Sequence, residues 1–195
     1  MPTGTAIRDV SQQLFDAAER VLLRGGPNAL TSRAVTTEAG CAKGVLHRHF
    51  ADFDAFLAEL VTDRIDRIRT QTRSLQAAAG TSTVADNLTQ ALTDLFGSVA
   101  VAIVSLITAR DELRTRLHQA GSSGVPVLTE ATAMIASYLG AEQKKGRVAS
   151  DADIDTIALT LIGTSHLLFA GRRGEAPETG EVRKIVTSVI ADAAR

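Results

Sequence analysis

Residues 30–60 read LTSRAVTTEAGCAKGVLHRHFADFDAFLAEL and contain two short helical patterns separated by a single glycine. The first pattern covers residues 32–39, can be capped by Thr31, and ends at Gly40, which takes left-handed backbone angles without steric cost. The second pattern begins almost directly after the turn and ends near Phe50. Two short helices around a glycine turn form a helix-turn-helix, whose second helix lies in the DNA major groove.

Apolar residues in this stretch are spaced so that they can hold the two short helices together. These residues are Val35, Ala39, Cys41, Leu46 and Phe50. The positions between them are left to face outward, and they are Ala42, Lys43, Val45, His47 and His49. The outward face is therefore small and basic, as a surface that approaches DNA needs to be.

The remainder of the chain also follows a helical period. One helical pattern over residues 10–24 precedes the motif and stops at Gly25-Gly26-Pro27, and a longer one begins after Asp52 and runs to about residue 76. Further apolar stripes at helical spacing follow, and no convincing strand or repeat is found. We predict an all-α protein of about nine helices.

The motif resembles the DNA-binding signature of TetR-family transcriptional regulators. The matching residues, in register, are Ala39-Gly40, Lys43-Gly44, Leu46 and His49-Phe50. The resemblance implies an N-terminal helix-turn-helix DNA-binding domain over residues 1–51. It also implies a helical effector-binding and dimerisation domain over residues 52–195, in which the helix of about residues 52–76 acts as a linker.

The resemblance further implies which side chains meet double-stranded operator DNA. The implied contacts are Thr31 and Arg33 to phosphate or a base edge, Lys43 to base edges, Ala42, Gly44 and Val45 at the groove floor, and His47 and His49 to phosphates. A lysine can donate to guanine O6 and N7, which agrees with the implied role of Lys43. The sequence departs from the family where Phe53 replaces a common phosphate-binding lysine.

Composition and charge exclude several other classes of protein. The chain has 195 residues, 45% of them hydrophobic and 22% charged, and a net charge of −1 that divides into +2 for residues 1–50 and −3 for the rest. The longest mostly apolar run covers residues 99–107, too short to cross a bilayer. The N-terminus has no signal-peptide core, and Cys41 has no second cysteine to pair with. We expect a cytoplasmic protein with no membrane partner.

The sequence offers little support for catalysis or metal binding. It contains no GxSxG, HExxH, CxxC or P-loop motif, so we expect no catalytic residues and no cofactor. His47 and His49 are two positions apart and point in different directions on a helix, so we expect no metal site. A helical adaptor that uses the same fold without a ligand or without DNA binding remains the alternative to a regulator.

Our main hypothesis is a homodimeric transcriptional regulator, most consistent with a repressor that an unknown small molecule releases from a palindromic operator. The residues that could meet the effector are Phe96, Arg110, Met134, Tyr138 and His166. The alternative is a surface ion pair for Arg110 and a place in the core for the other four. We expect a cavity among the helices of about residues 83–96, 126–144 and 154–169. The expected dimer interface is a four-helix bundle of the last two helices and their symmetry mates, formed by Leu161, Leu168, Val182, Val186, Val189 and Ala193.

Overall fold

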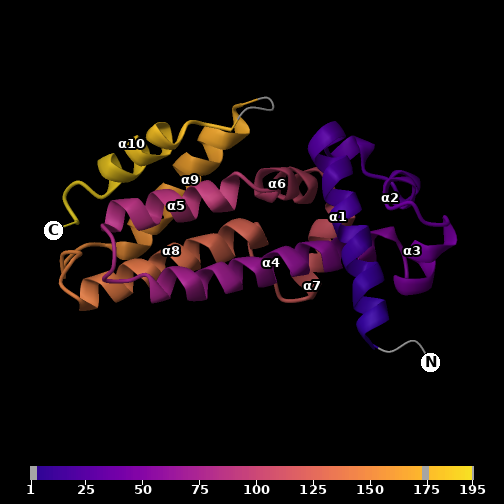
Figure 1. The fold of residues 1–195 in the computed structure, drawn as a ribbon, viewed down its shortest axis with the longest axis horizontal. Coiled ribbons are helices and arrows are strands. Elements are labelled where there is room, and N and C mark those ends of the chain that lie inside the picture. The colour runs from indigo at the N-terminus through magenta and orange to yellow at the C-terminus, as the bar shows by residue number, and fades with distance from the viewer. Residues whose placement is uncertain (1–3, 173–175, 195) are drawn as a thin grey trace. The chain divides into compact units, whose positions relative to one another are not determined.

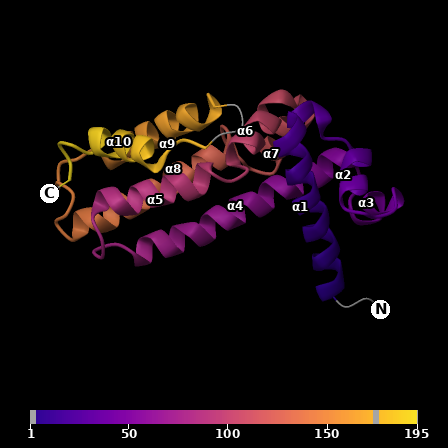
Figure 2. The same ribbon diagram turned by 45° about the horizontal axis from the view of Figure 1, so that its top comes forward.

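A computed structural model describes residues 4–172 and 176–194, and in these residues the regular structure is α-helical (Figures 1 and 2). The ten helices are α1 (Gly4–Ala29), α2 (Ser32–Glu38), α3 (Gly44–His49), α4 (Phe53–Ala77), α5 (Val84–Phe96), α6 (Ala100–Ala109), α7 (Asp111–Gln119), α8 (Pro126–Lys144), α9 (Ile154–Ala170) and α10 (Thr179–Val189). A single antiparallel bridge joins Val148 to Ala194. The expected all-α class is confirmed, with ten helices where about nine were predicted.

The chain divides into two compact units. The first comprises Met1–Asp63 and Ala102–Val125, and the second comprises Arg64–Val101 and Pro126–Arg195. Helices α4 and α6 therefore each contribute residues to both units. The domain boundary expected after residue 51 falls inside the first unit and stays a prediction.

Local sequence signals mark the starts of α2 and α4 and the stops in α1 and after α2, as expected. The backbone N–H of Ala34 donates to Thr31 Oγ1 at 3.1 Å, so Thr31 caps α2, and Gly40 adopts a left-handed φ of 65°. Asp52 caps the start of α4 by accepting from the N–H of Ala55 at 2.6 Å. Gly26 has a φ of 69° and interrupts α1 at the predicted stop, after which a short helical turn continues.

The first unit is built around a cluster of aromatic rings. Phe50 lies edge-on to Phe56 with 5.0 Å between ring centroids, and Phe15 of α1 lies 6.0 and 5.6 Å from these two rings. Edge-on and tilted ring pairs add stability beyond the area that they bury. The Gln13 side chain donates to the carbonyl of Ala39 at 2.8 Å, which joins α1 to the turn after α2. The two short helices are therefore anchored to one aromatic core.

The second unit contains a sheet-free bundle in which α8 packs on α9, and α10 lies along α5 and α9 (Figures 1 and 2). The apolar stripe of α10 is consumed by this packing, because Val182 and Val186 are both fully buried within the chain. Ala193 and Leu161 of the expected interface are buried too, while Leu168 and Val189 are half-buried.

Four of the six residues expected at the dimer interface are buried within the chain itself. A side chain that is buried against its own chain offers no surface to a second copy, so Leu161, Val182, Val186 and Ala193 are core residues. The exposed apolar side chains of α9 are instead Leu159, 64% exposed, and Leu167, 73% exposed.

Candidate functional site

Helix α3 presents an exposed, basic surface in the first unit. The exposed residues are Ala42, Lys43, Gly44, His47 and Arg48, and Val45 and His49 are half-exposed. Lys43 precedes the first residue of α3 at the cap position, although its φ of −49° and ψ of −33° are helical. Lys43 therefore lies at the N-terminal edge of the helix. A Cβ added at Gly44 would meet no atom within 4 Å, so the backbone here is open to close approach.

Buried contacts fix the orientation of this short helix. Leu46 is fully buried and Phe50 is 4% exposed, and both lie on the side of α3 opposite to the exposed positions. The N–H of Cys41 donates to the carbonyl of Thr36 at 3.0 Å across the turn. The outward direction of Lys43 and His47 is thus set by packing rather than by the helix alone, which is too short to be stable by itself.

Helix α2 adds exposed polar groups at its start. Thr31 and Arg33 are both exposed, and the Thr31 oxygen that caps the helix keeps its hydroxyl hydrogen for a second partner. At the other end of α2, the guanidinium groups of Arg24 and Arg20 bind the carboxylate of Glu38 and lower its pKa to about 2. Glu38 is therefore ionised and paired with cations at neutral pH.

One basic residue missed by sequence reasoning is Arg48. It is exposed on α3 directly beside His47, and the last turn of the helix consists of His47, Arg48 and His49. The sequence could have identified Arg48, because it directly follows the outward-facing His47 and lies between the buried positions Leu46 and Phe50.

Arg110, which was expected to meet the effector, lies in the first unit and contacts residues of that unit. Its guanidinium donates to the carbonyl of Leu30 at 3.0 Å, pairs with Asp54 at 3.5 Å, and lies 5.4 Å from the ring centroid of Phe53. Arg116 of α7 similarly binds Asp52 at 2.9 Å. Both arginines therefore connect the α6–α7 segment to the start of α4 and, through Leu30, to the residue before the α2 cap.

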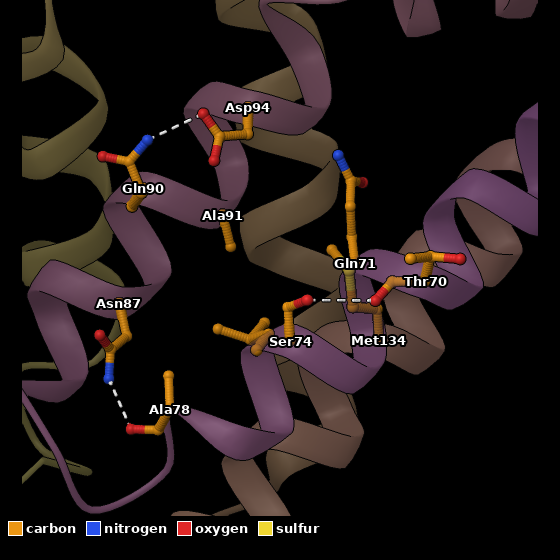
Figure 3. Close-up of a pocket in the computed structure, with 10 residues that line it drawn as sticks. Thr70, Gln71, Ser74, Ala78, Asn87, Gln90, Ala91, Asp94 and Met134 are labelled. Atoms are coloured by element: carbon orange, nitrogen blue, oxygen red, sulfur yellow. Dashed lines mark hydrogen bonds between the residues drawn. The ribbon is translucent and has the colours of Figure 1, made fainter.

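A pocket of about 380 Å³ lies in the second unit between α4 and α5 (Figure 3). Its lining residues are Thr70, Gln71, Ser74, Leu75 and Ala78 around α4, Asn87, Gln90, Ala91 and Asp94 of α5, and Met134 of α8. Met134 is the one expected effector-contacting residue that lines this pocket. The volume of the pocket lies at the lower end of the range for small-molecule sites.

Phe96, His166 and Tyr138, which were also expected to meet the effector, do not line this pocket. Phe96 is 2% exposed and packs on Phe169 with 5.7 Å between ring centroids. His166 lies 5.9 Å from the ring centroid of Phe96, and burial lowers its pKa, which favours the neutral ring. Tyr138 is fully buried.

Tyr138 belongs to a buried polar network next to the pocket. Its hydroxyl donates to Glu142 Oε1 at 2.6 Å and accepts from the side-chain amide of Asn87 at 3.0 Å. Glu142 is fully buried, pairs with Arg147 at 3.2 Å, and accepts from the N–H of Gly80 at 3.2 Å. Burial, followed by the hydrogen bond to Glu142, raises the pKa of Tyr138, so the phenol keeps its proton. The network links α5 and α8 to the loop after α4.

The pocket residues missed by sequence reasoning form a polar line on α5. Asn87, Gln90 and Asp94 follow each other at helical spacing on one side of the helix, next to its apolar stripe. From the sequence we considered the apolar stripe of α5, whereas the polar residues beside that stripe line the pocket.

The described residues also bear on membrane spans and metal sites. Within the part of the chain that the structure describes, no single helix is long and apolar enough to span a membrane, and the bent pair Val84–Phe96 and Ala100–Ala109 passes only by joint length and composition. Over the same residues, no group of three or more His, Cys, Asp or Glu side chains is placed to hold a metal ion.

Comparisons with known proteins agree with this geometry. Residues 14–60 match the model of the family "Bacterial regulatory proteins, tetR family", which includes all of α2 and α3. An uncharacterised HTH-type transcriptional regulator of Bacillus subtilis strain 168, YdgC, is 28% identical over 174 residues, covering 85% of this chain and 84% of that protein.

Solved structures share the fold over nearly the whole chain. A TetR-family regulator from Agrobacterium tumefaciens matches with a TM-score of 0.73 at 14% identity, covering 97% of this chain and all of that one. FadR from Bacillus subtilis, solved with stearoyl-CoA, matches with a TM-score of 0.63 at 16% identity, covering 92% and 95%. Residues 14–60 therefore match the tetR family of bacterial regulatory proteins, and the chain shares the fold of solved TetR-family regulators over nearly its whole length.

Proposed function

We propose that the chain represses transcription by binding a near-palindromic operator as a homodimer, and that a small molecule releases it. The observation that carries this proposal is the exposed basic surface of α3, held in place by Leu46 and Phe50 in the aromatic core. Lys43 reads base edges in the major groove, and His47 and His49 bind phosphates. Thr31 and Arg33 contact the adjacent backbone or a base edge, and Ala42, Gly44 and Val45 allow the close approach.

The dimer forms through the exposed face of α9. Leu159 and Leu167 are separated by two helical turns on this face, and Gly163 lies between them with no atom within 4 Å of an added Cβ. Large exposed apolar side chains around a small residue are typical of a helix that packs against another helix. A symmetric pair of chains brings two copies of α3 to DNA, which is why the operator has two related half-sites.

The effector enters the pocket between α4 and α5. The B. subtilis FadR solved with stearoyl-CoA supports the idea that this fold carries small-molecule ligands. Release follows from a population shift: a ligand that binds better to the conformation with low DNA affinity moves the protein into that conformation. We place the protein in the cytoplasm, where its DNA is.

The proposal is tested by selecting bound sequences from a pool of random DNA duplexes and measuring affinity for the selected site. Lys43→Ala should cost about 1–3 kcal/mol and relax preference at one base position in each half-site. His47→Ala should weaken selected and random DNA alike and reduce the salt dependence of binding. Lys144→Ala removes an exposed lysine from α8 and is the matched control, with no expected effect.

Two results would overturn the proposal. Failure to bind any duplex at low salt would favour the helical adaptor. Equal sequence preference for the wild type and Lys43→Ala would show that Lys43 does not read bases.

A further inference from the structure

The orientation of the Asn87 amide is fixed by the chemistry of its neighbours. The Tyr138 hydroxyl has one hydrogen, and it goes to the carboxylate of Glu142 at 2.6 Å. The Tyr138 oxygen must therefore accept, and Asn87 Nδ2 supplies the hydrogen at 3.0 Å. The same Nδ2 donates to the carbonyl of Ala78 at 3.3 Å (Figure 3). Both amide hydrogens of Asn87 are thus engaged, and its Oδ1 is left as the acceptor.

The two hydroxyl groups on the α4 side of the pocket also offer oxygen lone pairs rather than hydrogens. The hydroxyl of Thr70 donates to the carbonyl of Asp66 at 3.1 Å, and the hydroxyl of Ser74 donates to the carbonyl of Thr70 at 3.4 Å. Arg73 donates to the Thr70 hydroxyl at 3.1 Å but is not among the lining residues. The hydrogens of both lining hydroxyls are therefore already used within α4.

The formal charge among the ten lining residues is a single negative one, on Asp94. Asp94 Oδ1 accepts from Gln90 Nε2 at 2.8 Å, which leaves Gln90 Oε1 and the other carboxylate oxygen as further acceptors (Figure 3). Uncharged N–H groups remain on Gln90 and Gln71. A ligand with a carboxylate or phosphate would meet Asp94 without a lining cation to offset the repulsion.

The two fixed acceptors stand at opposite ends of the pocket. Asn87 and Asp94 are seven residues apart on α5, a rise of about 10 Å along the helix. Between them on α5, Gln90 and Ala91 line the pocket, and Leu75 and Met134 add apolar surface from other helices.

We propose that this pocket binds a small ammonium compound with an apolar body and a hydrogen-bond donor at its far end. The ammonium group binds Asp94, the body lies against Ala91, Leu75 and Met134, and the far donor reaches Asn87 Oδ1. Tyr138 acts as a positioning residue, because it holds Asn87 with its oxygen available. This inference rests on the proposed function, in which the same pocket receives the effector.

The test uses three aromatic probes of closely similar size, titrated by calorimetry into the full chain without DNA. Tyramine has an ammonium and a phenol, phenethylamine has the ammonium alone, and 3-(4-hydroxyphenyl)propanoate has the phenol with a carboxylate. We expect tyramine to bind about fivefold more tightly than phenethylamine, in proportion to one neutral hydrogen bond, and the carboxylate to bind most weakly.

Variants separate the two ends of the pocket. Asp94→Asn should weaken both amines about threefold, because Asp94 is exposed and solvent screens its pairing with an ammonium group, whereas Asp151→Asn, which changes an exposed acid outside the pocket, should change neither. Asn87→Ala should leave phenethylamine binding nearly unchanged and remove the advantage of tyramine.

Tyr138→Phe tests the positioning role by the ratio of tyramine to phenethylamine affinity, which a general loss of stability would not alter. We expect this ratio to fall toward one. Thermal unfolding of the same variant reports its stability separately.

Several results would overturn the inference. These are binding of none of the three probes, carboxylate binding equal to or tighter than tyramine binding, and unchanged amine affinity in Asp94→Asn. The proposed function fails on a different readout, the DNA binding of the protein without probes and the release of selected DNA by a bound probe. Amine binding without release would sustain the pocket chemistry and refute its regulatory role.

Discussion

Replacing Leu167 with glutamate should dissociate the dimer while leaving the fold intact. Leu167 is 73% exposed, and complete burial of a leucine side chain contributes about 1.5–3 kcal/mol. Covering the exposed part therefore contributes ~1–2 kcal/mol in each chain and ~2–4 kcal/mol in a symmetric pair. The dissociation constant should rise by roughly 30- to 1,000-fold, before any cost of bringing two carboxylates together.

The assay is sedimentation equilibrium over a wide range of concentrations, combined with thermal unfolding of each variant. Leu23→Glu is the matched control, because Leu23 is also exposed, at 60%, but lies on α1. Val186→Glu should instead lower the melting temperature sharply, since it places a carboxylate in a fully buried position. The α9 interface would be refuted if Leu167→Glu remained dimeric at the concentrations at which the wild type is dimeric. Dissociation of the dimer by Leu23→Glu would also refute it.

Four further variants test the geometry of the first unit. Gly40→Ala should lower the free energy of unfolding, measured by chemical denaturation, by about 1–2 kcal/mol because Gly40 has a positive φ. Gly44→Ala should leave this free energy unchanged or raise it, but should weaken DNA binding in a DNA titration. Arg110→Gln should lower the free energy of unfolding by about 1–3 kcal/mol, through loss of the charged hydrogen bond to Leu30, without changing amine affinity in the calorimeter. Because the pKa of Glu38 is lowered to about 2, its ion pairs stabilise the fold above about pH 4.5 and lose that effect as pH falls toward 2, so the stability difference between wild type and Glu38→Gln should shrink over this range in acid denaturation.

The parts of the fold that the sequence predicted well depend on residues within one helical turn of each other. The Thr31 cap, the left-handed Gly40 and the Asp52 cap each require a side chain or a backbone angle at one position and an N–H a few residues away. The helix-turn-helix followed from these signals together with the buried spacing of Leu46 and Phe50.

The sequence showed that a helix face is buried or that a side chain is charged, but not which distant residues contact it. The stripe that contains Val182 and Val186 suits a partner chain or the same chain equally well, and here α5 and α9 cover it. Arg110 follows an apolar run in the sequence, but its hydrogen-bond partners lie 56 and 80 positions away, at Asp54 and Leu30. No local signal could assign these contacts.

Tyr138 shows how a residue can be chosen for the correct region and given the wrong role. A tyrosine beside the apolar stripe of a helix suggests a hydroxyl that is available to a ligand, yet this hydroxyl gives its hydrogen to Glu142, one helical turn away. The fully buried Glu142 carboxylate needs that hydrogen, together with Arg147 and the N–H of Gly80, because an ionised group without partners is costly away from water. The Asn87 side chain, rather than the Tyr138 hydroxyl, therefore lines the pocket, and its amide is held by Tyr138, 51 positions away on α8.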